Sequence, residues 1–374
     1  MTDDGTAGAE VGGMAVGAQS ETAPAFRRHD IDWLRIAAIG LLILYHAVIG
    51  FQPWARDIWF IQNDQTLEWL WIPMSLLNVW RIPLLFVVSG MGLRFALERR
   101  DWKQLLADRF LRIFVPLAFG FFVICPITAI LFTSRYGGGL VYLPNAGHLW
   151  FLVNLFLYVL VLLPFLGFFR KPDGNPALRF LARSFRRPLA LFFLAIPPML
   201  EAWILDPEIY WAYAGSLHGL ALGLVCFSGG FILASLGPVF WASVVRVRLP
   251  ALLAAFSLYL VRLLAFGLQH EPAPMVALES SCWLLAVFGF SATFLNRPAR
   301  HLRYLSEGVY PMYILHMPIQ FALSRIVFSL PLPAAIKLLL LLAGVLGLSL
   351  AAYECVRRVF WLRPLLGLRP HAKA

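Results

Sequence analysis

The chain has 374 residues, of which 60% are hydrophobic and only 14% are charged, and its formal net charge is +11. Soluble globular proteins carry about 25% charged residues, so a soluble enzyme and an intrinsically disordered chain are both nearly excluded. The composition indicates a membrane protein, in which the excess positive charge is expected in the loops of one face.

The N-terminal segment differs from the rest of the chain. Residues 1–25 contain four acidic residues and no Lys or Arg, and they are rich in Gly, Ala, Ser and Thr. A secretory signal peptide needs a basic start and an apolar run, and this segment has neither. We therefore expect a disordered cytoplasmic tail over 1–25, a membrane domain over 26–365 and a cytoplasmic C-terminal tail over 366–374.

Apolar stretches follow one another along the remainder of the chain. Each is close to the roughly 20 residues that a helix needs to cross a bilayer. The stretch 188–205 is short and contains Pro197 and Pro198, so we expect a kink in it. The predicted spans are 31–51, 69–94, 110–133, 149–169, 188–205, 215–237, 249–268, 273–295, 304–328 and 333–357.

The basic residues alternate from loop to loop, as they should if this number of spans is correct. Of the 31 Lys and Arg residues, 24 lie in the flanks and loops of one face, and only Arg56 and Arg135 lie in the opposite loops. We infer an all-α polytopic membrane protein with about ten transmembrane helices and both termini in the cytoplasm. The chain shows no internal repeat, which counts against transporter folds built from paired halves.

Two ionisable residues of the first span share one helix face. Arg35 and His46 are eleven residues apart, which is almost three turns, so they lie roughly 16 Å apart along the axis. Arg35, near the cytoplasmic end, suits an anion such as a phosphate, and His46, in the outer half, can move a proton. The alternative is that Arg35 pairs with Asp32 while His46 forms a hydrogen bond to a neighbouring helix.

Two further motifs lie in the second span and at the start of the third. Arg109 and Arg112 stand at i and i+3 on the cytoplasmic end of a helix, where two cations can hold an anion. They are equally well explained as positive residues that fix the topology. In the second span, Ser89 and Gly90 are small residues that allow a close helix approach or backbone access to a ligand.

Histidines also occur in the fourth and ninth spans. His148 precedes Trp150 at the outer end of the fourth span, where a Trp is an ordinary interface anchor but a His is less common. In the ninth span, Tyr313 and His316 share a face, and Pro311 loosens the backbone beside them. Ionisable residues at such depths mark a functional site unless they form ion pairs between helices or reach the interface.

Together these motifs resemble the acyltransferase-3 family of integral membrane acyltransferases, and they follow the family's order from about residue 28 to about residue 320. The chain is also similar to the branch of that family called glucan biosynthesis protein C. The matching pieces are Asp32-Trp-Leu-Arg35 with His46, Phe-Val-Val-Ser89-Gly90, Arg109-Phe-Leu-Arg112, Gly147-His148-Leu-Trp150-Phe-Leu and Tyr310-Pro-Met-Tyr313-Ile-Leu-His316.

The resemblance implies an inner (plasma) membrane enzyme that moves an acetyl or succinyl group from cytoplasmic acyl-coenzyme A to a hydroxyl of an extracytoplasmic carbohydrate. His46 would be the catalytic base or acyl relay, with His148 and His316 as further catalytic candidates. The anionic donor would be held by Arg35, Arg109 and Arg112. The outer-half polar groups, which would meet the sugar, are Arg81, His148, Glu201, His218, Arg262, Glu279 and His316.

The expected partners are acyl-coenzyme A, a periplasmic or cell-surface glycan and the lipid bilayer. We expect no nucleic acid, no metal site and no permanently bound cofactor. The alternative function is a transporter or flippase for a polar or lipid-linked sugar, because buried charges and outer-half histidines also suit proton coupling. An enzyme should release free coenzyme A from acyl-coenzyme A and a glycan, whereas a transporter should not.

Overall fold

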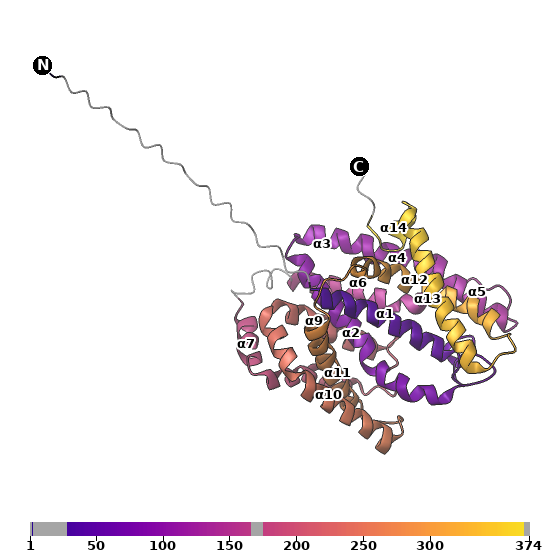
Figure 1. The fold of residues 1–374 in the computed structure, drawn as a ribbon, viewed down its shortest axis with the longest axis horizontal. Coiled ribbons are helices and arrows are strands. Elements are labelled where there is room, and N and C mark those ends of the chain that lie inside the picture. The colour runs from indigo at the N-terminus through magenta and orange to yellow at the C-terminus, as the bar shows by residue number, and fades with distance from the viewer. Residues whose placement is uncertain (1, 3–27, 166–174, 370–374) are drawn as a thin grey trace.

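The fold is helical throughout the part of the chain that the computed structural model describes, which is residue 2 and residues 28–165 and 175–369 (Figure 1). The expected disordered tail lies outside this part except for residue 2, and so do residues 370–374 at the opposite end. Within the described ranges there is no β-strand, which confirms the predicted all-α class.

The helices are numbered in chain order. The helix Trp102–Arg135 is one continuous stretch, in which π-helical turns at Phe110–Phe114 and Gly120–Ile124 join three α-helical pieces. The α-helices are α1 (His29–Ile49), α2 (Trp71–Leu97), α3 (Trp102–Arg109), α4 (Val115–Phe119), α5 (Cys125–Arg135), α6 (Trp150–Leu162), α7 (Pro176–Phe185), α8 (Ile196–Leu205), α9 (Leu217–Ser235), α10 (Pro238–Phe266), α11 (Ala273–Phe294), α12 (Leu302–Val327), α13 (Ala334–Arg358) and α14 (Leu362–Leu365).

Nine helical segments of the described chain are long and apolar enough to cross a membrane. They correspond to nine of the ten predicted spans and confirm a multi-pass membrane protein. The remaining predicted span, 304–328, coincides with α12, which has 26 residues but is not among the nine. Because α12 packs against α1 and α13, which are both among them, we place α12 across the same bilayer.

Two predicted boundaries were wrong, and both helices begin earlier than hydropathy indicates. The third span begins at Trp102 instead of residue 110, where Asp101 caps the helix and accepts a hydrogen bond from the Gln104 backbone. The span predicted over 249–268 is α10, which begins at Pro238, so Arg246 and Arg248 lie in a helix and not in a loop. With 29 residues, α10 is about 43 Å long at 1.5 Å per residue, so its basic first turns can extend beyond a hydrocarbon layer of about 30 Å.

The predicted kink near Pro197 coincides with a change of helix type. Residues Pro188–Ala195 form a 3-10 helix, and the α-helix α8 begins at Ile196. A proline in the first turn of a helix loses no backbone hydrogen bond, because its missing N–H would have no partner there. The two prolines therefore start α8 instead of interrupting it.

Helices α2 and α9 touch backbone to backbone. A Cβ atom at Gly90 would lie 1.9 Å from the carbonyl oxygen of Phe227, and one at Gly230 would lie 2.0 Å from that of Val87. Only glycine permits such an approach, so Gly90 serves close helix packing, as one of its two sequence interpretations predicts. This contact fixes α2, the helix that carries Arg81, against α9.

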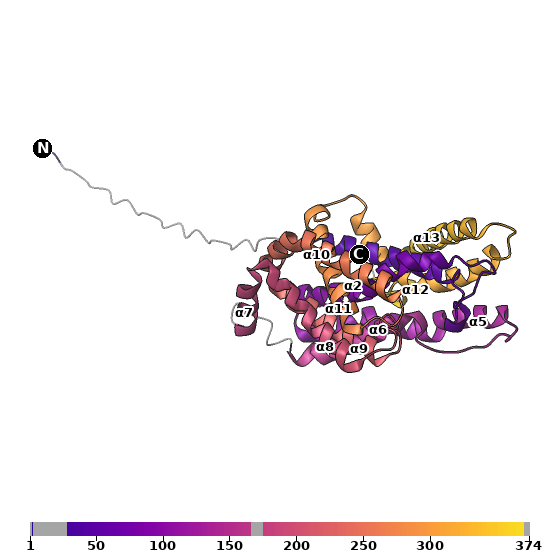
Figure 2. The same ribbon diagram turned by 90° about the horizontal axis from the view of Figure 1, so that it is seen from below.

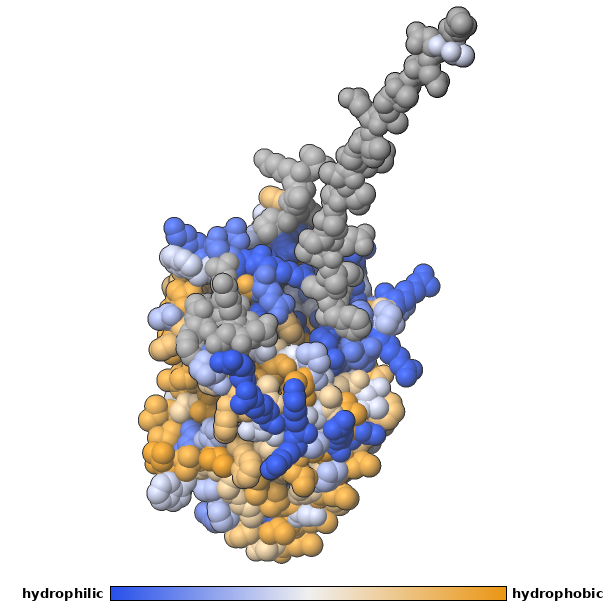
Figure 3. Space-filling model, turned by 90° about the vertical axis from the view of Figure 1, so that its left-hand side faces the viewer, coloured by the Kyte–Doolittle hydropathy of each residue, from blue (hydrophilic) through white to orange (hydrophobic). Residues whose placement is uncertain are grey.

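The long axis of the molecule runs between α7 and α5, which lie at opposite ends in both ribbon views (Figures 1 and 2). Figure 3 views the end that lies on the left-hand side of Figure 1. Hydrophilic residues gather in the upper and central parts of this face, and hydrophobic residues cover most of its lower part. This division is the one expected of a membrane protein whose polar ends face water and whose apolar sides face lipid.

Reporter fusions test the predicted topology. We expect fusions after Lys171 and after Arg300 to report the cytoplasm, because basic loops remain on that side, and a fusion within 135–147 to report the outside. The measurement is the activity of a paired cytoplasmic and extracytoplasmic reporter at each position. A cytoplasmic signal within 135–147 would contradict the number of spans and, with it, the outer-half position of His46.

Candidate functional site

Three histidines from distant parts of the chain meet inside the helix bundle. They are His46 of α1, His148 of the 3-10 turn before α6 and His316 of α12. His46 Nδ1 lies 3.0 Å from His316 Nε2, and the rings of His148 and His316 have centroids 5.3 Å apart. The structure thus brings together the three histidines that the motifs single out, and their catalytic roles stay predictions.

Helix α12 holds the other two histidines in place. The hydroxyl of Tyr313 donates to the carbonyl oxygen of His148 at 2.6 Å, and His148 Nε2 lies 3.0 Å from the carbonyl oxygen of Ile314. Gln320 Nε2 donates to the carbonyl oxygen of His46 at 2.7 Å. Side chains or carbonyls of α12 therefore fix the backbone at both partner positions, which limits the motion of the rings.

The hydrogen bonds determine which nitrogen of each ring carries the proton. His316 Nδ1 lies 2.7 Å from the carbonyl oxygen of Tyr313, and a carbonyl only accepts, so Nδ1 is protonated. In a neutral ring Nε2 then has a lone pair, and it must accept from His46 Nδ1. His46 Nε2 keeps its own lone pair and is the nitrogen of this pair that is free to take a proton.

The two rings of this pair differ in access. His316 is fully buried, whereas His46 is partly exposed, and the rings are parallel to within 2°. A buried acceptor behind a partly exposed base orients the base and stabilises the positive charge that it acquires, as the acid of a Ser-His-Asp triad does. Chemically, this arrangement can remove a proton from a hydroxyl that reaches His46.

Arg81 of α2 is the cation whose charge acts on both His46 and His316. Its side chain is buried, and its guanidinium carbon lies 4.0 Å from the ring centroid of Tyr45. Within the described chain, its Nε atom has no hydrogen-bond partner. A buried cation with a free donor can stabilise negative charge that develops beside His46.

A second group of cations lies at the other end of the shared face of α1. Arg109 Nη2 donates to the carbonyl oxygen of Gly92 at 3.3 Å, and Arg35 Nη2 lies 2.6 Å from the place that a Cβ atom at Gly92 would take. Arg35 and Arg112 both act electrostatically on Arg109. The structure thus brings together the three arginines that the motifs predict to bind an anion.

Two of these three arginines, Arg109 and Arg112, retain unused hydrogen-bonding capacity. The Nε atoms of Arg109 and Arg112 are buried without a hydrogen-bond partner in the described residues. The nearby acid Asp108 is paired with Arg100 at 2.8 Å, and Asp32 lies 3.8 Å from Arg35. Clustered guanidinium groups with free donors are suited to a phosphate or carboxylate, which they bind through paired hydrogen bonds.

Several other intramembrane charges bond to one another and not to this site. Arg262 and Glu279 are only 1% and 0% exposed and form a bidentate ion pair at 2.8 and 3.2 Å. Glu201 Oε1 lies 2.8 Å from His218 Nδ1. These pairs join neighbouring helices, as intramembrane charges commonly do, and the expectation that the four residues meet a sugar stays a prediction.

Two residues that orient the site were not identified from the sequence. Gln320 follows His316 by one helical turn, so its place on the same face of α12 was available as a signal. Gly92 follows Gly90 by two residues, but the spacing does not show that two arginines of other helices converge on it. Among the described residues, no group of three His, Cys, Asp or Glu side chains could hold a metal ion.

Comparison with known proteins gives one match. The family model described as an acyltransferase domain, of the acyltransferase-3 type, covers residues 28–354 and includes all six predicted site residues. No curated protein and no solved structure matches the chain. Since the matched region is most of the 374 residues, the chain belongs to the acyltransferase-3 family of integral membrane acyltransferases.

Proposed function

We propose that this membrane acyltransferase moves an acyl group from acyl-coenzyme A, bound from the cytoplasm, to a hydroxyl of an extracytoplasmic carbohydrate, in the inner (plasma) membrane. The supporting observation is the placement of an arginine cluster and a histidine pair on one face of α1, about three turns apart. Coenzyme A has the matching shape, with phosphates at one end and the thioester at the end of a long flexible arm.

In the proposed reaction, His46 Nε2 removes the hydroxyl proton while the hydroxyl oxygen attacks the thioester carbonyl carbon. A carbon–oxygen bond forms, and the carbonyl oxygen becomes negative. When this intermediate collapses, the carbon–sulfur bond breaks, and the leaving thiolate takes the proton from His46, which yields the ester and free coenzyme A. No proton or electron has to come from another reactant.

Two further residues have proposed roles in this step. His316 is a positioning residue, because its Nε2 accepts from His46 Nδ1 in every state of His46 and so favours the imidazolium. Arg81 would donate to the oxyanion of the intermediate, since its charge is buried near the histidine pair and its Nε is free of protein partners in the described chain.

An aromatic cluster supports a carbohydrate as the acceptor. Trp54, Trp71 and Trp211 pack together with ring centroids 5.0–6.2 Å apart, and all three lie beside the ends of helices on the His46 side of the bilayer. Phe60, of the same region, lies 5.6 Å from the His46 ring. Indole faces offer large apolar surfaces with one polar edge, which suits the C–H faces and hydroxyls of a sugar ring.

Release of coenzyme A from the purified protein tests this function. In lipid nanodiscs supplied with acetyl- or succinyl-coenzyme A and a glycan, we expect acceptor-dependent release of free thiol and a matching gain in glycan mass. The matched control is His46→Ala in the same nanodiscs. In sealed proteoliposomes, movement of an unmodified glycan across the membrane without thiol release would contradict the proposal and support the flippase alternative.

A further inference from the structure

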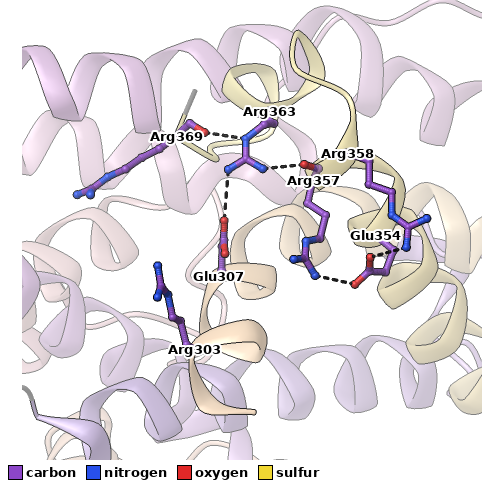
Figure 4. A pocket seen from close by; sticks show the side chains of 7 residues that line it. All are labelled: Arg303, Glu307, Glu354, Arg357, Arg358, Arg363 and Arg369. Carbon is purple, nitrogen blue, oxygen red and sulfur yellow. Dashed lines mark hydrogen bonds and ion pairs between the residues drawn. The ribbon is translucent and has the colours of Figure 1, made fainter. Parts of the chain in front are cut away.

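A second set of arginines surrounds a cavity where α12 begins and α13 ends (Figure 4). Its volume, about 640 Å³, lies in the range of small-molecule sites. Five arginines and two glutamates give it a surplus of positive charge. The lining residues are Arg303, Glu307, Glu354, Arg357, Arg358, Arg363 and Arg369.

The two carboxylates of this cavity hold three of the arginines. Glu354 pairs with Arg357 at 3.0 Å and with Arg358 at 3.3 Å. Glu307 lies 3.5 Å from Arg363, which also donates at 2.7 Å to the carbonyl oxygen of Arg357 and is 6% exposed. These ion pairs hold one side of the cavity together and balance the negative charge of its two carboxylates.

The other two arginines keep their charge available. Arg303 and Arg369 have no ion pair with a carboxylate within the described chain, and Figure 4 shows both on the side of Glu307 that faces away from Arg357 and Arg358. Both side chains are exposed, so a solute can reach them. Two unpaired guanidinium groups at a cavity of this size favour a doubly charged anion such as a phosphate monoester.

The cavity adjoins the arginine cluster of the candidate site. Helix α14 packs against α4, which follows Arg112 along the chain. Arg369 lies close enough to Arg112 for their charges to interact, and Tyr310 of α12 lies near both Arg109 and Arg112. A Cβ atom at Gly367 would lie 2.2 Å from the ring of Tyr310, so this ring packs against the segment between Arg363 and Arg369, two residues that line the cavity. The Tyr310 hydroxyl is buried and has no hydrogen-bond partner in the described residues.

We propose that this cavity binds the phosphate monoester on the ribose of the donor, the 3′-phosphate of coenzyme A, while Arg35, Arg109 and Arg112 bind its diphosphate. The inference rests on the proposed function, because only that donor carries both groups on one nucleotide. Arg303 and Arg369 would contact the monoester, and the Tyr310 hydroxyl would donate to the part of the nucleotide between the two anions.

The test compares acyl-coenzyme A with acyl-dephospho-coenzyme A, which lacks the 3′-phosphate. For the unmodified protein we expect the KM of acyl-dephospho-coenzyme A to be about 10- to 100-fold higher than that of acyl-coenzyme A. This is the factor that the loss of a hydrogen bond to a charged group produces. The double variant Arg303→Gln with Arg369→Gln should raise the KM for acyl-coenzyme A by that factor and leave the other donor unchanged. Arg300→Gln, which removes an exposed charge outside the cavity, is the matched control.

Three outcomes would overturn the proposal. In the first, the unmodified protein has the same KM for both donors. In the second, the double variant raises the KM for both donors by the same factor. In the third, the double variant changes only the response to anionic lipid in the nanodisc, which would identify a lipid headgroup phosphate as the occupant. Equilibrium binding of both donors is measured as well. Binding that depends on the 3′-phosphate without any acyl transfer would refute the proposed reaction and leave the cavity assignment standing.

Discussion

Replacing His46 with glutamine should produce a folded, membrane-inserted protein that transfers acyl groups about 10²–10⁴-fold more slowly, the usual contribution of general-base catalysis. The amide of glutamine can still donate to His316 Nε2, but it cannot accept a proton at working pH. His46→Ala should be equally inactive. The measurement is the rate of coenzyme A release at matched protein levels, together with donor binding, which should persist through Arg35.

Variants of His316 provide the control for this interpretation. His316→Gln keeps an amide oxygen that can accept from His46 Nδ1, so we expect it to retain more activity than His316→Ala. A residue that only fills space would show no such rescue. Near-normal acyl transfer by His46→Gln would show that His46 merely links two helices, and the role of the base would then pass to His316.

Replacing Arg109 or Arg112 with alanine should raise the donor concentration needed for half-maximal rate by about 10- to 100-fold, because each change removes hydrogen bonds between a guanidinium and a phosphate. Arg109→Lys should recover only part of the loss, since an ammonium group cannot form the paired contact. The measurement is the dependence of thiol release on acyl-coenzyme A at saturating acceptor.

Arg300→Ala is the control for this series, because it removes a positive charge on the same side of the protein from an exposed position. Its donor dependence should match that of the unmodified protein. If Arg109→Ala and Arg112→Ala also keep the unmodified donor dependence, these two residues only orient the chain in the membrane.

Hydropathy predicted the helices because each span must satisfy its backbone within itself and bury apolar side chains in lipid or protein. The span at α12 was predicted although that helix is less apolar than its neighbours. The basic residues Arg297 and Arg300 before α12 and Arg357 at the end of α13 belong on one face, which requires two crossings between them. Hydropathy could not locate the starts of α3 and α10, since those turns need not lie in the hydrocarbon layer. Their positions depend on local signals, a cap at Asp101 and a proline at 238.

The site was only partly predictable for a related reason. Helical periodicity relates Arg35 to His46, which lie on one helix, and it relates Tyr313 to His316. The contact between His46 and His316 joins residues 270 positions apart, and no periodicity specifies it. The same holds for Arg262 and Glu279, which pair across α10 and α11.

The hydrogen bonds that run from His46 through His316 end at the carbonyl oxygen of Tyr313, which holds no proton to pass on. A proton that His46 accepts therefore has no onward path along this chain and must leave on the side from which it came. An enzyme that spans a membrane with a proton gradient needs such a break, because a continuous chain of titratable groups would conduct protons and dissipate the gradient. The carbonyl oxygen of Tyr313 ends the proton path on one side of His316, while the chemistry takes place at His46 on the other side.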